Sequence, residues 1–322
     1  MELEQLLPAI SGMTWQHLIM IGVGVTLIYL AIAKKYEPTL LLPMGFGAIL
    51  VNIPLSSAIT QIDPATGEAL EGVLNIFFDA GIATEIFPLL IFIAIGAMID
   101  FSSLFRNPSL LLFGAAAQFG IFMTMVLAAL LGYDIREAAS IGIIGAADGP
   151  TSIVVASRFA PHMLGPISVA AYSYMALVPI IQPPVIKLLT SRKERLIRMK
   201  TDANRQISKK ALIAFPIVIT ITAGLIAPSS LALVGFLMFG NLIRECGVLN
   251  KLSLSAQNEL SSLVTILLGI TIASTMTADR FIRVDTLIII GLGLFAFVFD
   301  TFGGVIFAKF LNIFRKEDNK IN

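Results

Sequence analysis

Long apolar stretches alternate with short polar loops along almost the whole chain. A helix of about 20 apolar residues is long enough to cross the hydrocarbon core of a bilayer. The pattern therefore predicts an all-α polytopic membrane protein with about nine transmembrane helices, at 14–33, 39–58, 86–101, 108–132, 161–189, 211–227, 229–243, 261–277 and 286–311. An interrupted apolar segment at 138–157 is predicted to be a broken or re-entrant helix.

The composition supports a membrane protein. Of the 322 residues, 57% are hydrophobic and 13% are charged, about half the charged share of ordinary globular proteins. Together with a mean hydropathy of +0.89, this excludes a water-soluble enzyme and a disordered chain. The net charge of +1 excludes a nucleic-acid binder that relies on bulk electrostatics. One cysteine and two histidines exclude a disulfide framework and a histidine-built metal site.

The placement of lysine and arginine predicts the orientation, because basic loops face the cytoplasm. Basic residues are densest in the loop 191–210, whereas the loop 59–85 has only acidic charges. The amino terminus is therefore expected outside and the carboxyl end inside, although Arg280 and Arg283 fall on the wrong side of this arrangement. The basic loop has two open interpretations: a determinant of topology in contact with lipid headgroups, or a docking surface for a cytoplasmic partner.

Two pairs of weakly similar segments indicate an internal repeat. The segment PMGFGAILVN at 43–52 resembles FLMFGNLIRE at 236–245, and LFRNPSLLLF at 104–113 resembles RFIRVDTLII at 280–289. Under the charge pattern, the two members of the first pair run in opposite directions through the membrane. Inverted repeats of this kind are common in transporters, which place the ion site between the two copies. The sequence thus predicts an inverted-repeat, transporter-like architecture.

The second copy is predicted to be incomplete. The offset that relates the copies would place the counterpart of 144–153 beyond Asn322. The expected division has four parts: the amino-terminal helix and first span at 1–38, the first repeat at 39–190 with its broken helix and Pro-rich segment 161–189, the cytoplasmic basic loop at 191–210, and the second, incomplete repeat with its basic tail at 211–322.

The broken segment holds the most unusual chemistry in the chain. Asp148 is followed by Gly149 and Pro150 in an otherwise apolar run, and a carboxylate at bilayer depth costs about 2.5–3.5 kcal/mol on insertion scales. Proline has no amide hydrogen for the carbonyl of Ala146, and glycine permits an unwound backbone. We expect free carbonyls of Ala146 and Gly149 near the carboxylate, and the hydroxyls of Thr151 and Ser152 beside them.

One negative charge among neutral oxygens suits a monovalent cation, and unwound carbonyls coordinate Na⁺ in transporters. The sequence therefore predicts a sodium site at Asp148. Two alternatives stay open at this point: a carboxyl group that takes up protons, or a buried aspartate that only caps the second half-helix.

Further polar residues lie in other apolar stretches. Tyr172 and Tyr174 point in different directions on a helix, so at most one should reach Asp148. A tyrosine hydroxyl can ligate a cation or pass on a proton, but membrane tyrosines are often interfacial anchors. Asn241 is expected to hydrogen-bond a neighbouring helix. Asp300 is either a cap near a bend or a residue of an ion path.

These residues carry a resemblance to a known family. The run GIIGAADGPTSIVVASRFAPHMLGPISVAAYSYMALVPIIQPPVIKLLTS at 142–191 resembles the β subunit of sodium-translocating biotin-dependent decarboxylases, which include the oxaloacetate, methylmalonyl-CoA, glutaconyl-CoA and malonate enzymes. The segments FGNLIRECGVLNKLS at 239–253 and VTILLGITIASTMTADRFI at 264–282 are similar to it as well. The resemblance covers nearly all of the chain.

The resemblance implies a function and partners. A biotin-carrying carboxyltransferase α subunit would present carboxybiotin, and a small membrane γ/δ subunit would complete an oligomeric complex in the cytoplasmic membrane of a bacterium or archaeon. The β subunit would decarboxylate carboxybiotin, consume a proton and move Na⁺ outward. Asp148 matches the family's sodium-site aspartate, and Tyr174 matches the tyrosine assigned to sodium or proton handling, which leaves Tyr172 without a role.

The family also continues with a second broken segment that begins Asn-Pro-Leu-Ile-Gly. Asn322 is expected to be its first residue, so half of the sodium site is expected to lie outside these 322 residues, in a fragment or a natural truncation. Coupled pumping by these residues alone is not expected. A secondary Na⁺/H⁺-type transporter without chemistry, or an inactive truncated scaffold subunit, is the alternative function.

Overall fold

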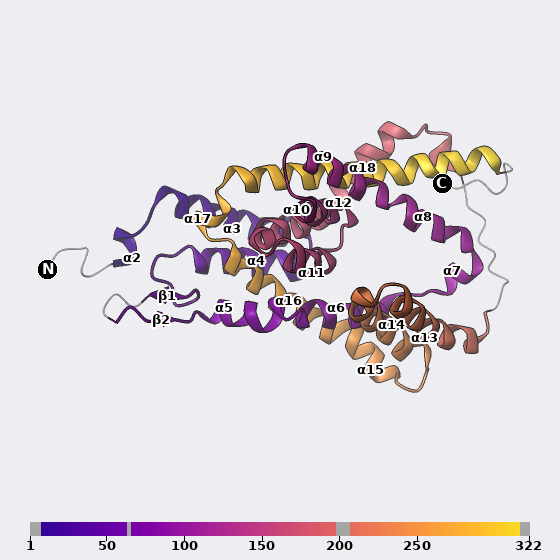
Figure 1. The fold of residues 1–322 in the computed structure, drawn as a ribbon, viewed down its shortest axis with the longest axis horizontal. Helices are drawn as coiled ribbons and strands as arrows, with labels where there is room; N and C mark the ends of the chain where they lie inside the picture. The colour runs from indigo at the N-terminus through magenta and orange to yellow at the C-terminus, as the bar shows by residue number, and fades with distance from the viewer. Residues whose placement is uncertain (1–7, 63–65, 198–206, 316–322) are drawn as a thin grey trace.

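A computed structural model describes residues 8–62, 66–197 and 207–315. The described residues are helical except for one short antiparallel ribbon and the connecting loops (Figure 1). The α-helices are α2 (Pro8–Ser11), α3 (Trp15–Ala33), α4 (Pro38–Val51), α5 (Val73–Phe77), α6 (Ile86–Met98), α7 (Ser102–Arg106), α8 (Leu111–Ala116), α9 (Gln118–Leu130), α10 (Ile135–Gly142), α11 (Gly149–Phe159), α12 (Leu164–Leu189), α13 (Lys209–Ile226), α14 (Leu231–Glu245), α15 (Asn250–Ser255), α16 (Ser261–Ile272), α17 (Ala278–Phe281) and α18 (Val284–Phe314).

Shorter elements connect these helices. The ribbon pairs β1 (Gln61–Ile62) with β2 (Ala69–Leu70). The 3₁₀ and π segments are η1 (Phe78–Ala83), η2 (Pro108–Leu110), η3 (Ile143–Ala146), η4 (Pro161–Met163), η5 (Glu194–Leu196), η6 (Pro228–Ser230), η7 (Ala256–Leu260) and η8 (Ala273–Thr275).

The structure confirms a helical protein suited to a membrane. Within the described residues, five helical stretches are long and apolar enough to cross a bilayer, or six if a bent pair counts as one span. The pair consists of 73–83 and 86–98, which meet at an angle of 57°. The nine-span count is not confirmed by these criteria and stays a prediction. The five stretches are Trp15–Ala33, Pro108–Leu130, Lys209–Ile226, Asn250–Thr275 and Val284–Phe314.

Many large apolar side chains on these helices lie on the surface, as expected of helices that face lipid. In α13, for example, Ile221, Leu225 and Ile226 are exposed. The buried side chains instead gather around the helices in the middle of the molecule, from α10 to α12, together with α4 and α16. The core therefore surrounds the broken segment that the sequence singles out.

Glycines allow two helices, α6 and α14, to cross at very short range. A side chain at Gly96 would overlap the carbonyl of Leu237, and one at Gly240 would overlap the carbonyl of Ile93. Small residues at such crossings let two backbones approach closely in a membrane. Asn241 adds an interhelical hydrogen bond from Nδ2 to the carbonyl of Ile99 at 3.0 Å, as its sequence position predicts.

Arg244 strengthens the same contact, because it donates to the carbonyl of Met98 at 2.5 Å. The last carbonyls of a helix have no partner within it. Asn241 and Arg244 together satisfy carbonyls at the end of α6, which fixes this end against α14.

The chain uses one order of elements twice. A short α-helix, a π-helical segment and a longer α-helix follow one another in α5–η1–α6 and again in α15–η7–α16. In each case the longer helix packs on an equivalent partner, α6 on α14 and α16 on α4. The partners are themselves paired with the helix before them, α4 with α3 and α14 with α13.

The α6–α14 crossing gives a stability prediction. Gly96→Ala places a methyl group against backbone atoms of α14, so we expect a loss of about 1–3 kcal/mol, as for other overpacked sites. The matched control is Gly291→Ala in α18, where a methyl group meets nothing within 4 Å. That change should be neutral or stabilise by about 0.5–1 kcal/mol. Thermal unfolding in detergent compares the two variants, and equal midpoints would contradict the close crossing.

Candidate functional site

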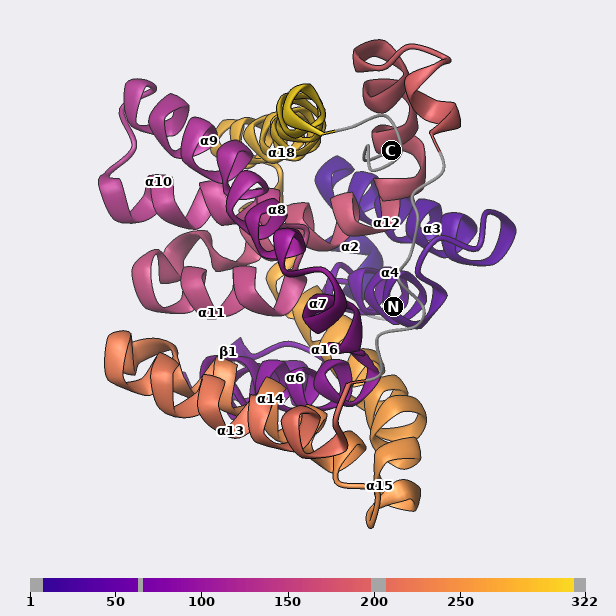
Figure 2. The same cartoon turned by 90° about the vertical axis from the view of Figure 1, so that its right-hand side faces the viewer.

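The segment around Asp148 folds back on itself as a hairpin. Its first arm, α10, begins with a capping box in which Glu137 accepts a hydrogen bond from the backbone amide of Asp134 at 2.9 Å. The second arm, α11, ends next to this start, because Nε2 of His162 lies 2.9 Å from a carboxylate oxygen of Glu137. The two arms run side by side (Figure 2). We call residues 135–159 the hairpin.

An ion pair holds the end of α11. Arg158 contacts both carboxylate oxygens of Glu85, at 2.8 and 3.2 Å, and its third hydrogen bond goes to the carbonyl of Ser229 at 3.2 Å. Two-point contacts between arginine and a carboxylate fix geometry better than a single contact. Arg158 therefore ties α11 to the start of α6 and to the turn before α14.

The helix breaks at the tip of the hairpin, at the position that the sequence predicts. After η3, Ala147 adopts a left-handed conformation with φ of 53°, and Asp148 is extended. A left-handed backbone is unfavourable for a residue with a side chain. Pro150 lies in the first turn of α11, where its missing amide costs nothing. The turn thus places Asp148 between the carboxyl end of one short helix and the amino end of the next.

Polar atoms gather at this turn. The hydroxyl of Thr151 donates to the carboxylate of Asp148, and the hydroxyl of Ser152 donates to the Asp148 carbonyl at 2.9 Å. Ser152 is fully buried, whereas Asp148 is partly buried. Asp148 and the hydroxyls of Thr151 and Ser152 therefore form one local cluster of oxygen atoms.

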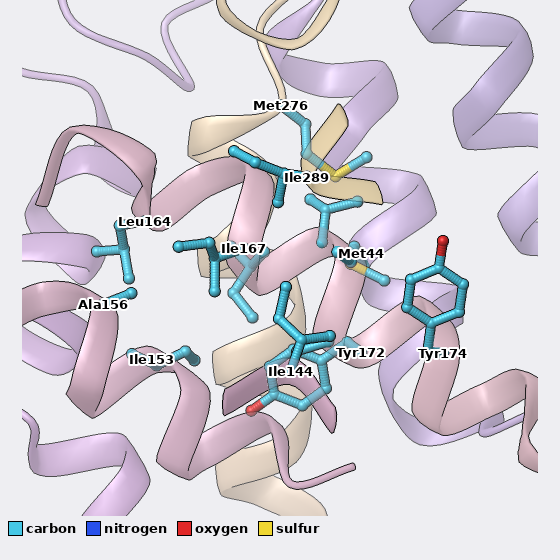
Figure 3. Close-up of a cluster of buried hydrophobic side chains, with 14 of the residues drawn as sticks. Met44, Ile144, Ile153, Ala156, Leu164, Ile167, Tyr172, Tyr174, Met276 and Ile289 are labelled. Carbon is cyan, nitrogen blue, oxygen red and sulfur yellow. The ribbon is translucent and has the colours of Figure 1, made fainter. Parts of the chain in front are cut away.

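Apolar side chains and two glycines enclose the turn. Ile144 and Ile153 are fully buried, and so is Ile167 of α12 (Figure 3). Gly145 packs closely against Ala296 of α18, and Gly142 against the carbonyl of Ile121 in α9. The cluster of oxygens is consequently set in a tightly packed apolar region.

The two tyrosines of α12 have different contacts. The hydroxyl of Tyr174 donates to the carbonyl of Ile290 in α18 at 2.5 Å. Tyr172 instead packs its ring on Gly149, the residue that follows Asp148. Figure 3 shows the two rings pointing in different directions. The ring at the turn is therefore that of Tyr172, whereas the resemblance gives Tyr174 the role in sodium or proton handling.

The comparisons with known proteins agree with the sequence. The chain matches, over residues 16–322, the family described as Na⁺-transporting oxaloacetate decarboxylase beta subunit. It is 48% identical to the methylmalonyl-CoA decarboxylase subunit beta of Propionigenium modestum, over 95% of this chain and 81% of the relative. The chain belongs to this β-subunit family.

Two further relatives have other carboxylic-acid substrates in their names. The chain is 50% identical to the glutaconyl-CoA decarboxylase subunit beta of Acidaminococcus fermentans, over 93% of this chain and 76% of the relative. It is 42% identical to the oxaloacetate decarboxylase beta chain of Klebsiella pneumoniae, over 99% of this chain and 86% of the relative. The family is therefore confirmed, and the two alternative functions are not favoured.

The remaining candidates of this β subunit lie elsewhere. Asn241 serves the α6–α14 crossing, with its amide oxygen buried and without a hydrogen-bond partner. Asp300 lies in α18, where its backbone packs closely against Gly120 of α9. One carboxylate oxygen of Asp300 is also buried without a partner. Asn322 lies outside the described residues.

Sequence reasoning missed the residues that anchor the hairpin. Arg158 and Glu85 are 73 positions apart, and His162 and Glu137 are 25 positions apart. Their partners are brought together only by the packing of the helices. The one local signal is the capping box of Asp134 and Glu137 at the start of α10.

The hairpin makes a prediction about labelling. Ile135 and Phe159, at the outer ends of the two arms, are exposed. In a background with Cys246→Ser, Ile135→Cys and Phe159→Cys should react with a membrane-impermeant maleimide from the same side of sealed vesicles. Arg192→Cys in the basic loop is the control, and it should react from the opposite side. Reaction of the first two cysteines from opposite sides would mean that the segment crosses the membrane.

Proposed function

We propose that this chain is the membrane subunit of a sodium pump, which decarboxylates carboxybiotin and exports Na⁺ across the cytoplasmic membrane. The observation that carries the proposal is the carboxylate of Asp148 at the broken tip of the hairpin. The family and the names of the relatives support the decarboxylation and the sodium transport. Na⁺ is the transported substrate.

The turn suits a small cation for an electrostatic reason. The carboxyl end of a helix carries partial negative charge on its last carbonyls, and η3 ends at Ala146, directly before the carboxylate. We propose that Na⁺ binds Asp148, the carbonyls of Ala146 and Gly149, and the hydroxyls of Thr151 and Ser152. The ion would neutralise a carboxylate that is costly to hold in an apolar region. The hydroxyls already lie on the Asp148 side of α11.

The substrate of the decarboxylation, carboxybiotin, would come from a partner subunit. A biotin-carrying carboxyltransferase α subunit would bring carboxybiotin to the cytoplasmic face, and a small γ/δ subunit would complete the complex. Cleavage of the bond between the biotin nitrogen and the carboxyl carbon releases CO₂, and the nitrogen takes up one proton. We propose that Tyr174 takes part in the movement of this proton or of Na⁺, from its place between α12 and α18.

The basic loop is the proposed docking surface. Its described part lies near the end of α18, where Lys309 contacts Glu194 at 3.1 Å. Lysines and arginines on a cytoplasmic loop attract anionic lipid headgroups, and the same charges suit an acidic surface on the α subunit. We keep both roles in the proposal, since one loop can serve both.

We further propose nine spans arranged as an inverted repeat, with the division of the chain expected from the sequence. The repeated order of a short α-helix, a π segment and a longer helix supports this arrangement. The equivalent pairings of α6 with α14 and of α16 with α4 support it as well. Under this scheme the loop 59–85 lies outside and the loop 191–210 lies in the cytoplasm.

Replacement of the carboxylate tests the proposal. At about 4 Å and an effective dielectric constant of about 20, a carboxylate attracts a cation with about 4 kcal/mol, which corresponds to about a thousandfold in affinity. Asp148→Asn should therefore abolish sodium-stimulated decarboxylation and sodium uptake by the complex reconstituted with its biotin-carrying subunit. Both are measured in sealed vesicles, as release of CO₂ and as entry of radioactive sodium.

The matched control is Asp134→Asn. Asp134 is the amino-terminal cap of α10, and asparagine caps helices equally well, so this variant should keep both activities. Normal sodium uptake by Asp148→Asn would refute the assignment of the site.

A further inference from the structure

We infer that Tyr172 is a further residue of the sodium site, whose hydroxyl oxygen ligates the bound Na⁺. The inference rests on the proposed function, and it assigns a role to a residue that the sequence left without one. It depends on the burial of the hydroxyl, on its position at the Asp148 turn, and on the contrast with Tyr174.

The hydroxyl of Tyr172 is buried without a protein partner. The residue is 2% exposed, and no described residue hydrogen-bonds to its hydroxyl oxygen. Buried tyrosine hydroxyls usually find a partner, because leaving one unsatisfied is unfavourable. Tyr174, two positions along the same helix, meets this requirement with the carbonyl of Ile290. Of these two tyrosines, only Tyr172 therefore has a buried hydroxyl without a hydrogen-bond partner.

The position of the ring places this oxygen at the broken turn. A side chain at Gly149 would overlap Cζ and Cε1 of Tyr172, the atoms at the hydroxyl end of the ring. A residue larger than glycine at position 149 would thus clash with the Tyr172 ring. Gly149 directly follows Asp148 in the chain, so the ring lies beside the residue that carries the carboxylate. Apolar side chains such as Ile144 and Ile153 are fully buried around the turn, so they supply no competing polar partner.

A neutral hydroxyl suits this place chemically. It has one hydrogen to donate and lone pairs to offer. With the site empty, the Tyr172 hydrogen can turn toward the carboxylate of Asp148. With Na⁺ bound, the hydrogen turns away and the oxygen faces the ion. The hydroxyl remains protonated in both arrangements, so the step consumes no proton and only exchanges one electrostatic contact for another.

The test is Tyr172→Phe in the complete decarboxylase complex, with Na⁺ as the varied ligand. Loss of one ligand should raise the Na⁺ concentration for half-maximal decarboxylation about tenfold, the equivalent of one good hydrogen bond. The maximal rate at saturating Na⁺ should stay within about twofold, because the remaining ligands still form the site. Tyr36→Phe is the control, since Tyr36 is a partly buried tyrosine outside the site, and it should change neither quantity.

Three outcomes decide the inference. A raised half-saturation with a preserved maximal rate supports it. An unchanged half-saturation overturns it, whether or not the maximal rate falls, because a packing role alone would not alter sodium affinity selectively. If Tyr172→Phe fails to assemble with its partner subunits, Tyr172→Leu, which also removes the hydroxyl, is judged by the same criterion.

The parallel measurement on Asp148→Asn separates this inference from the proposed function. If Asp148→Asn is inactive while Tyr172→Phe behaves as the wild type, the sodium site stands and the role of Tyr172 fails. If the wild-type complex decarboxylates without any dependence on Na⁺, the proposed function itself fails.

Discussion

The structure depends on the difficulty of holding one carboxylate inside an apolar, tightly packed region. In the middle of a regular helix, every backbone N–H and C=O group is already hydrogen-bonded within the helix. The carboxylate of Asp148 would therefore find no free backbone partner there. The chain meets this constraint by ending one short helix and starting another at the same point. The carboxylate then has hydroxyls beside it and unpaired helix ends on both sides. The left-handed Ala147 and the proline in the first turn of α11 follow from that requirement.

A broken helix needs to be held from outside, and its two ends are held differently. The outer ends of the hairpin are fixed by polar contacts, an ion pair between Arg158 and Glu85 and a side-chain contact between His162 and Glu137. The tip is fixed by close packing, where Gly145 and Gly142 let α18 and α9 approach. Within the hairpin, the other charged residues lie near its outer ends, and Asp148 is the one charged residue at its tip. This arrangement places few charged side chains deep in the apolar region, where each of them costs the most free energy.

The features that could be predicted from sequence are local ones. The break at Asp148 follows from the three residues Asp-Gly-Pro in an apolar run, and the helical membrane class follows from the spacing of the apolar stretches. The hydrogen bond from Asn241 to a neighbouring helix could also be expected, because a buried amide in a membrane helix has few other partners.

Features that depend on packing could not be predicted. Helical spacing says that Tyr172 and Tyr174 face apart, but which of them faces the turn is decided by how α12 fits between α11 and α18. The family resemblance favoured Tyr174, whose hydroxyl reaches α18. The Arg158–Glu85 pair joins residues 73 apart, and no local pattern connects them.

The two asparagines show how the proposed repeat would hold its halves together. Asn241 of α14 donates to the carbonyl of Ile99 after α6, and Asn52 after α4 donates to the carbonyl of Met276 after α16 at 2.8 Å. Each asparagine thus satisfies a carbonyl where its partner helix ends, and each keeps a buried amide oxygen without a partner. The two asparagines are not at equivalent positions of the similar segments 43–52 and 236–245, since Asn241 aligns with Ala48 and not with Asn52. Both nevertheless make the same kind of hydrogen bond. The geometry of the helix pair, more than the identity of any one position, therefore sets where a polar side chain is needed.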